Sequence, residues 1–183
     1  MVVVGVSNEN GSNNGGIASV TIGGITATEV GASAPYASLW YASVPTGATT
    51  SVVVTCQIGA LNQVAIVVGA VTGESSATPN ATSSYPTTLA ADPQTIPSVG
   101  TSTVARNGVA VVFAAGGNGG TPTWTNTTSS VGDYYTFSTT GNTLAALLAH
   151  SYATGNQKYT LRGSIGNGYG FNGITAVVGD WTP

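Results

Sequence analysis

Few residues in this chain could perform acid–base or nucleophilic chemistry. His150 is the only histidine and Cys56 the only cysteine. Along a strand, His150 shares a face with Leu148 and Tyr152, which favours a hydrogen-bonded histidine near a strand end over a general base. Cys56 alternates with apolar neighbours such as Val54, which predicts a buried, unreactive thiol. A single cysteine also excludes an internal disulfide framework and a cysteine-based zinc site.

The carboxylates are equally sparse, and the chain holds six of them: Glu9, Glu29, Glu74, Asp92, Asp133 and Asp180. A glycoside hydrolase needs two carboxylates about 5 to 9.5 Å apart, and nothing in this spacing predicts such a pair. No Gly-x-Ser-x-Gly nucleophile elbow is present. The oxygen-rich segment 7–14 has one carboxylate and lacks the spaced aspartates of a calcium loop, so it predicts a polar turn. We expect a non-enzymatic protein with no catalytic residue, bound metal or cofactor.

Aromatic side chains support a binding hypothesis. Sugar rings stack on exposed aromatic faces, and Tyr and Trp add a polar group that can hydrogen-bond. The candidate ligand-binding residues are Trp124, Tyr134, Tyr135 and Tyr169. Packing of large residues in the core is the alternative for each of them. Trp40 is expected in the core, and strand alternation predicts that its neighbour Tyr41 is then not buried.

The elements that must carry these side chains are predicted to be strands. The chain has 28 Thr, 18 Ser and 26 Gly, residue types that favour strands and turns, and no dozen-residue segment shows a helical period. About a dozen short strands follow: 2–6, 19–22, 26–30, 37–44, 51–58, 64–71, 109–115, 122–126, 134–138, 144–153, 159–163 and 173–181. We expect an all-β antiparallel β-sandwich, jelly-roll or Ig-like. A right-handed β-helix is the main rival, but the chain has no fixed short repeat.

Turn residues and apolar runs predict how these strands connect. Gly23-Gly24 and the segment 45–48 each predict a hairpin. The runs 64–68 and 109–113 are apolar on both faces, which indicates strands between layers or against a neighbouring subunit. Residues 72–103, with four prolines, predict a long connection with an edge strand near 87–90. We expect residues 1–183 to form a single domain, because each half is small for a core of its own.

Only nine side chains are charged, giving 5% against about 25% in a typical soluble domain. Three cations cannot form a nucleic-acid patch or a polybasic membrane anchor. No apolar run reaches the roughly 18 residues of a membrane helix, and residues 1–6 lack the features of a signal peptide. We therefore expect neither nucleic-acid nor membrane partners. A nearly uncharged surface suits a protein that packs beside copies of itself.

Five segments in order carry a resemblance to a known kind of domain: 19–24, 27–30, 39–47, 52–55 and 71–79. Together they resemble a β-sandwich domain of tailed-bacteriophage and prophage virion proteins. The similarity covers about residues 1 to 80, and the segments at 124–125 and 173–181 match more loosely. Such domains serve as capsid decoration, head-fibre or tail-associated modules, and the resemblance supplies no catalytic residue.

The resemblance implies a virion location, with copies of the chain and other virion proteins as partners. An earlier strand is expected where this sequence opens on residues 2–6, so we expect an open sheet edge covered by a neighbouring subunit. The alternative function is a carbohydrate-binding module, free or on a fibre, which would bind a host-surface glycan through the aromatic residues named above.

Overall fold

The chain is all-β in the part that the structure describes. The computed structural model describes residues 1–8, 17–30, 37–45, 47, 49–57, 64–73, 78–79, 81–87, 94–104, 109–117, 122–126, 134–138, 144–152, 157–165 and 174–181. Side chains are described for most of these residues up to position 73 and, beyond it, for Thr78, Pro79, Val109, Val111 and Trp181. The described residues contain fifteen strands and no helix, and every described strand pair is antiparallel.

The strands fall into two successive groups along the chain. The first group is β1 (Val2–Asn8), β2 (Ile17–Ile22), β3 (Ile25–Thr26), β4 (Thr28–Glu29), β5 (Ala37–Ala42), β6 (Val52–Cys56) and β7 (Val64–Ala70). The second group is β8 (Ala81–Thr87), β9 (Gln94–Val104), β10 (Val109–Gly117), β11 (Pro122–Asn126), β12 (Tyr134–Ser138), β13 (Leu144–Tyr152), β14 (Gln157–Ile165) and β15 (Ile174–Trp181). Each group forms two sheets of its own.

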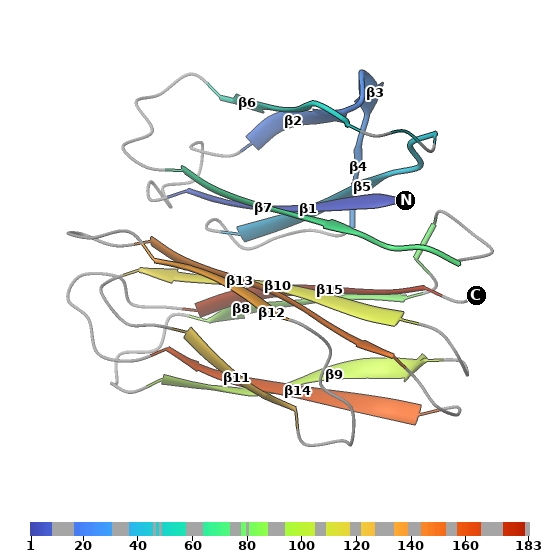
Figure 1. The fold of residues 1–183 in the computed structure, drawn as a ribbon. Coiled ribbons are helices and arrows are strands. Elements are labelled where there is room, and N and C mark those ends of the chain that lie inside the picture. The colour runs from blue at the N-terminus through green and yellow to red at the C-terminus, as the bar shows by residue number, and fades with distance from the viewer. Residues whose placement is uncertain are drawn as a thin grey trace.

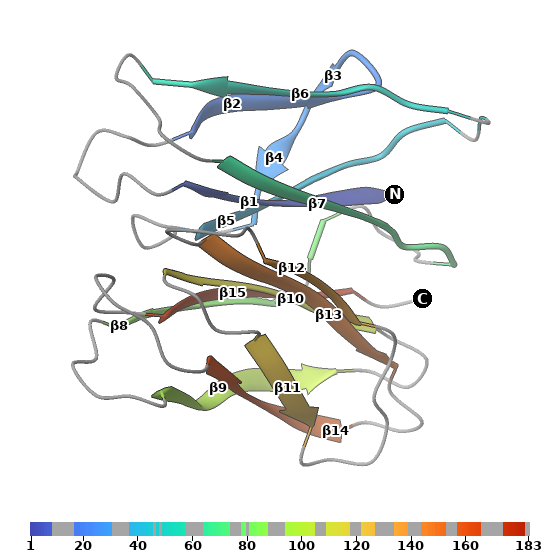
Figure 2. The same cartoon turned by 60° about the vertical axis from the view of Figure 1, so that its left-hand side comes forward.

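Four sheets result, and they stack as layers. Sheet A has the strand order β4-β5-β1-β7 and sheet B the order β3-β2-β6. Sheet C has the order β12-β13-β10-β15-β8 and sheet D the order β11-β14-β9. Figures 1 and 2 show the layers in the sequence B, A, C, D from top to bottom. Sheets A and C therefore lie in the interior of the stack.

The predicted hairpin at Gly23-Gly24 is confirmed. It joins β2 to β3, and Ile22 pairs with Ile25 across it. Both glycines have positive φ, 61° and 79°, as a tight two-residue hairpin turn requires. The chain then crosses from sheet B to sheet A at the buried Ala27. As a result, β3 forms one edge of sheet B and β4 forms one edge of sheet A.

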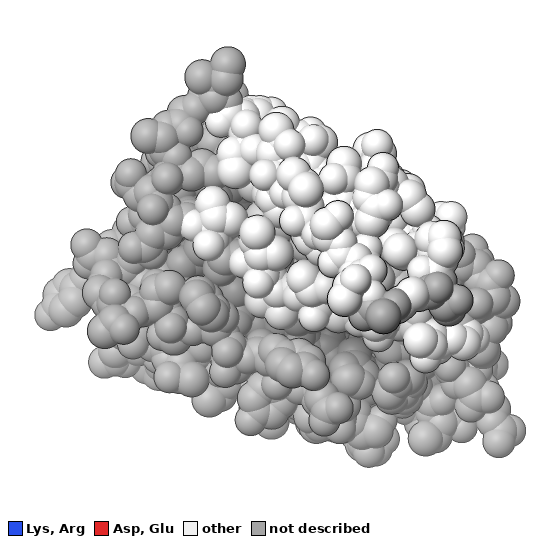
Figure 3. All heavy atoms as spheres, turned by 45° about the horizontal axis from the view of Figure 1, so that its top comes forward, with Lys and Arg blue, Asp and Glu red and all other residues white. Residues whose placement is uncertain are grey.

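The core between sheets A and B follows from strand alternation. In β6 the half-buried residues Val52, Val54 and Cys56 alternate with exposed ones, which confirms the predicted alternation, although Cys56 is only half-buried and not buried as predicted. The half-buried valines pack on a buried cluster formed by Val4, Val6, Val20, Ile22, Ala27, Trp40 and Ala42. Figure 3, which views the molecule from above sheet B, shows no Lys, Arg, Asp or Glu among the described residues of that face.

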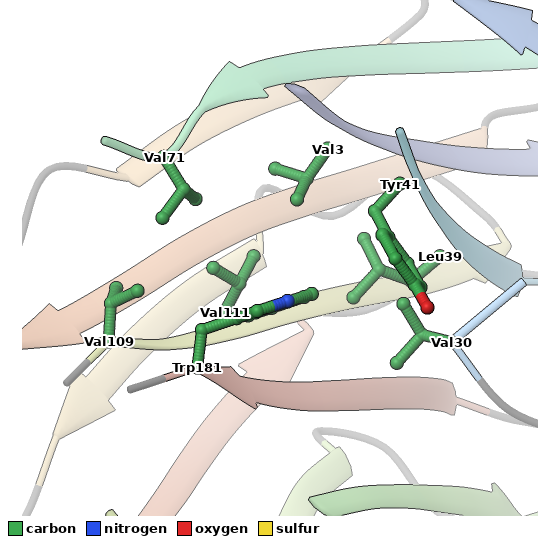
Figure 4. Packing of buried hydrophobic residues seen from close by; sticks show 8 residues of the cluster. All are labelled: Val3, Val30, Leu39, Tyr41, Val71, Val109, Val111 and Trp181. Atoms are coloured by element: carbon green, nitrogen blue, oxygen red, sulfur yellow. The ribbon is translucent and has the colours of Figure 1, made fainter. Parts of the chain in front are cut away.

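A second core joins sheet A to sheet C. It contains Val3, Val30, Leu39, Tyr41, Val71, Val109, Val111 and Trp181 (Figure 4). Trp40 and Tyr41 thus point to opposite faces of β5, yet both are only 8% exposed. The prediction that only one of them is buried was wrong. Alternation holds along the strand, but sheet A is covered on both of its faces.

The two halves of the chain repeat one arrangement. The order β4-β5-β1-β7 in sheet A matches β12-β13-β10-β15 in sheet C, and β6 beside β2 in sheet B matches β14 beside β11 in sheet D. Registers match as well, because Val3 pairs with Gly69 and Val111 pairs with Gly179. Sheets A and C pack through these equivalent strands, with β5 against β15 and β7 against β13. The interface between the halves is therefore approximately two-fold symmetric.

One predicted connection was wrong. Segment 45–48 does not close a hairpin, because β5 pairs in sheet A whereas β6 pairs in sheet B, so the chain changes layer here. The stretch 72–103, predicted as a long connection with an edge strand near 87–90, contains the edge strand β8, which ends at Thr87, and the greater part of β9. Pro86 and Pro97 lie in the edge strands β8 and β9, which tolerate proline because only alternate N–H groups of an edge strand are needed for pairing, and Pro97 also lies at a register irregularity between β9 and β14.

Candidate functional site

The predicted ligand-binding aromatics lie in different sheets. Trp124 is on β11 at one edge of sheet D, opposite Gly163, while Tyr134 and Tyr135 are on β12 at one edge of sheet C. Only the backbone is described at these three positions, and Tyr169 lies outside the described residues. Three of the four predicted ligand-binding residues therefore lie on edge strands of two different sheets, and the structure does not describe their side chains as one site. Their role in binding stays a prediction.

The candidate catalytic groups are likewise dispersed. His150 pairs with Val111 across β13 and β10, Glu29 is exposed on β4, and Asp180 lies on β15. Cys56 is half-buried, because β6 is an edge strand of sheet B and leaves the end of its row partly uncovered. The other candidate acids lie outside the described residues: Glu9, Glu74, Asp92 and Asp133. Among the described side chains, no group of three could hold a metal ion.

The feature that stands out in the structure is the outer edge of β7. Ile66 and Val68 pair with Val6 and Val4 of β1, so they share the face of sheet A that is turned toward sheet B. Val4 and Val6 are buried there, whereas Ile66 is 46% and Val68 45% exposed. The three described strands of sheet B do not extend over β7, so an apolar row stays in contact with solvent.

This row continues to both ends of β7. Val64, 38% exposed, precedes it on the same face, and the exposed Ala70 follows it. No other described strand pairs with the outer edge of β7, nor with the outer edge of β6 in the sheet above. We call this surface the open edge: the row Val64, Ile66, Val68 and Ala70, together with the outer edge of β7.

The open edge carries no charge. The sequence has no Asp, Glu, Lys, Arg or His from residue 30 to residue 73, a range that contains β5, β6 and β7. Charges, especially lysine, are a common means by which soluble proteins keep a sheet edge from pairing with another chain. The open edge lacks that protection.

Five of the other sheet edges in this chain carry such protection, whereas the edge strands β6 and β12 contain neither a charge nor a proline. The opposite edges of sheets A and B are the two-residue strands β4 and β3, and β4 carries Glu29. Proline occurs in the edge strands β8, β9 and β11, at Pro86, Pro97 and Pro122. By contrast, β7 has seven residues, contains no proline and pairs with β1 without a bulge. It presents a flat, regular template for another strand.

The open sheet edge expected from the sequence was not assigned to residues 64–70, although the sequence contained the signal. The run 64–68 is apolar on both faces, which indicated a strand between layers or against a neighbouring subunit. In the structure the two faces of this run have different surroundings. Val67 is partly buried against the core between sheets A and C, whereas Ile66 and Val68 on the other face are exposed to solvent.

Comparison with known proteins gives no further assignment. No family model matches the chain, and neither a curated protein nor a solved structure is similar to it. The described residues include no helix long and apolar enough to cross a membrane.

Proposed function

We propose that the protein is a non-enzymatic structural component of a bacteriophage virion, which packs into a symmetric assembly on the capsid or tail. We further propose that each half is an antiparallel β-sandwich with jelly-roll or Ig-like connections. Its partners in this role are copies of itself and other virion proteins. The proposal extends the resemblance of residues 1 to about 80 to virion domains.

The observation that carries this proposal is the open edge. An apolar row 45–46% exposed at Ile66 and Val68, on an uncharged edge strand, is a surface on which a soluble monomer would tend to associate. Five other edges carry a protecting feature, so the contrast supports a role for this edge in contact with another chain. The low charge of the chain supports the same role, because close packing of copies then brings few like charges together.

The alternative is a carbohydrate-binding module that uses Trp124, Tyr134, Tyr135 and Tyr169. Trp124 and the pair Tyr134-Tyr135 lie in adjacent layers, on β11 and β12, and β11 packs near β13, the partner of β12. The backbone positions of Trp124, Tyr134 and Tyr135 are therefore compatible with a shared binding surface.

Light scattering on the purified full chain, at two protein concentrations, tests the proposal. A molar mass above 18.0 kDa that rises with concentration is the expected result. A monomer at both concentrations, together with a glycan array on which the chain binds and the Trp124→Ala variant does not, would replace the structural role with the carbohydrate-binding one.

A further inference from the structure

We infer that β7 pairs antiparallel with β7 of a second copy of this chain, about a two-fold axis through Val67. The two A sheets would then form one continuous sheet across the interface. This inference rests on the proposed function in that it names the surface and the partner through which assembly occurs. The partner that pairs with the open edge is then a second copy of the chain.

The second half of the chain shows how this edge position is filled. The strand equivalent to β7 is β15, and β8 pairs with its outer edge, antiparallel, from Ile174 opposite Thr87 to Asp180 opposite Ala81. The strand equivalent to β6 is β14, and β9 pairs antiparallel with its outer edge. No described strand occupies the equivalent places beside β7 and β6. An antiparallel strand is therefore the element that fits the open edge.

The sequence of β7 is suited to pairing with itself. Centring the pair on Val67 engages all seven residues, and it places Ile66 opposite Val68 and Val64 opposite Ala70 of the second copy. The two-fold axis that relates the two copies is perpendicular to the sheet. If it passed between two residues, residues opposite each other would point to different faces of the sheet, so it must pass through a residue. Centring on Ile66 or Val68 instead would pair five residues. The Val67 register is the one that joins both apolar rows along their full length.

Electrostatics favours a second copy over a charged partner. Self-pairing brings identical charges close to each other near the axis, and this repulsion destabilises the pairing of charged edge strands. Here residues 30–73 carry none, so the pairing meets no such repulsion. One strand pair buries an area at the low end for protein interfaces, so we expect dimers that dissociate on dilution.

The first test introduces one positive charge on the open edge. In light scattering, Ile66→Lys and Val68→Lys should each return the full chain to 18.0 kDa at a concentration where the unchanged chain has twice that mass. The matched control is Val53→Lys, since Val53 is 53% exposed on the outer face of β6 and lies outside the apolar row. It should leave the mass doubled. Thermal unfolding of all three variants shows whether each remains folded.

Disulfide trapping tests the register with variants that avoid a new charge. In a Cys56→Ser background, Ile66→Cys and Val68→Cys should cross-link to each other when the two proteins are mixed, and several-fold less when each is alone. Cross-linking of Ile66→Cys alone would instead show a pair centred on that residue and overturn the Val67 axis. Val53→Cys is the control for random collision.

The outcomes separate this inference from the proposed function. If the chain associates, but Val53→Lys dissociates it and Ile66→Lys does not, the pairing of β7 is wrong while the structural role stands. If the cross-links form as expected and the glycan array is positive, the pairing stands and the proposed function is replaced. If the chain is monomeric at both concentrations and the mixed cysteine variants do not cross-link, the pairing is wrong. Binding of a strand from another protein to that monomer would show that the open edge pairs with a different partner.

Discussion

The rings of Tyr41 and Trp181 meet edge to face between sheets A and C, with centroids 5.9 Å apart and planes inclined at 75° (Figure 4). Tyr41 comes from β5 in the first half of the chain and Trp181 from the end of β15 in the second. Trp181 is fully buried. The contact places an aromatic pair at the junction of the two halves, where it adds to the stability that burial alone gives.

Removing the indole should weaken the whole fold. We expect Trp181→Ala to lower the free energy of unfolding by about 3–5 kcal/mol, because it leaves a cavity between the two sheets. Urea unfolding followed by circular dichroism measures this loss. The matched surface change Val53→Ala should alter the free energy by less than about 0.5 kcal/mol. Equal effects of the two variants would contradict the assignment of Trp181 to the core, and Trp181→Phe supplies a milder variant if the alanine form does not fold.

A buried hydrogen bond between Trp40 and Ser38 should show coupling. Trp40 Nε1 donates to Ser38 Oγ at 2.7 Å, and both residues are buried. Ser38→Ala leaves the indole N–H without this acceptor and should cost about 1–3 kcal/mol. In a Trp40→Phe background the same change should cost clearly less, because the donor is already absent. A double-mutant cycle by urea unfolding measures the difference, and strictly additive effects would show that the bond is not energetically significant.

The two hairpin glycines should respond differently to alanine. Gly24 has φ of 79° and open space around the position of a Cβ, so Gly24→Ala should cost only the backbone strain of about 1–2 kcal/mol. At Gly23 a Cβ would also lie 2.7 Å from Thr50 Oγ1, so Gly23→Ala should lower the melting temperature further. Gly24→Asn is the control and should be tolerated best, since asparagine adopts positive φ more readily. The opposite ranking of the two alanine variants would contradict the turn geometry.

Self-association through the open edge should depend little on ionic strength. The edge has no charged residue, so raising sodium chloride from low to high concentration should leave the dimer fraction nearly unchanged. Sodium sulfate should increase that fraction, because it strengthens the burial of apolar surface. Sedimentation or light scattering across a salt series measures both effects. A dimer that dissociates in sodium chloride would point to a charged interface elsewhere on the chain.

Local features of the fold could be predicted from the sequence. The composition excluded helices, Gly23-Gly24 marked a turn that needs positive φ, and alternation in residues 51–57 assigned their faces. Each of these depends on neighbouring residues alone. The side-chain predictions that concern Trp124, Tyr134, Tyr135 and Tyr169 remain untested.

The arrangement of layers could not be predicted in the same way. Tyr41 is buried because Val109, Val111 and Trp181 of sheet C cover it, and these residues lie more than sixty positions further along the chain. The repeat of the two halves also escaped notice, because it preserves strand order and register while few letters match, such as Val67-Val68-Gly69 and Val177-Val178-Gly179. Pro86 and Pro97 indicated a loop, since whether an edge strand tolerates proline depends on its place in the sheet.

The approximate two-fold symmetry between sheets A and C has a consequence for how the molecule responds to dilution. Because both halves belong to one chain, their contact forms at an effective concentration that the connecting segment sets, commonly in the millimolar range, and the concentration of the protein does not affect it. The open edge has no such tether. The contact between sheets A and C therefore persists in a single isolated chain. The pairing of β7 with a second copy forms only where copies are concentrated, as on a lattice that holds neighbouring copies in place.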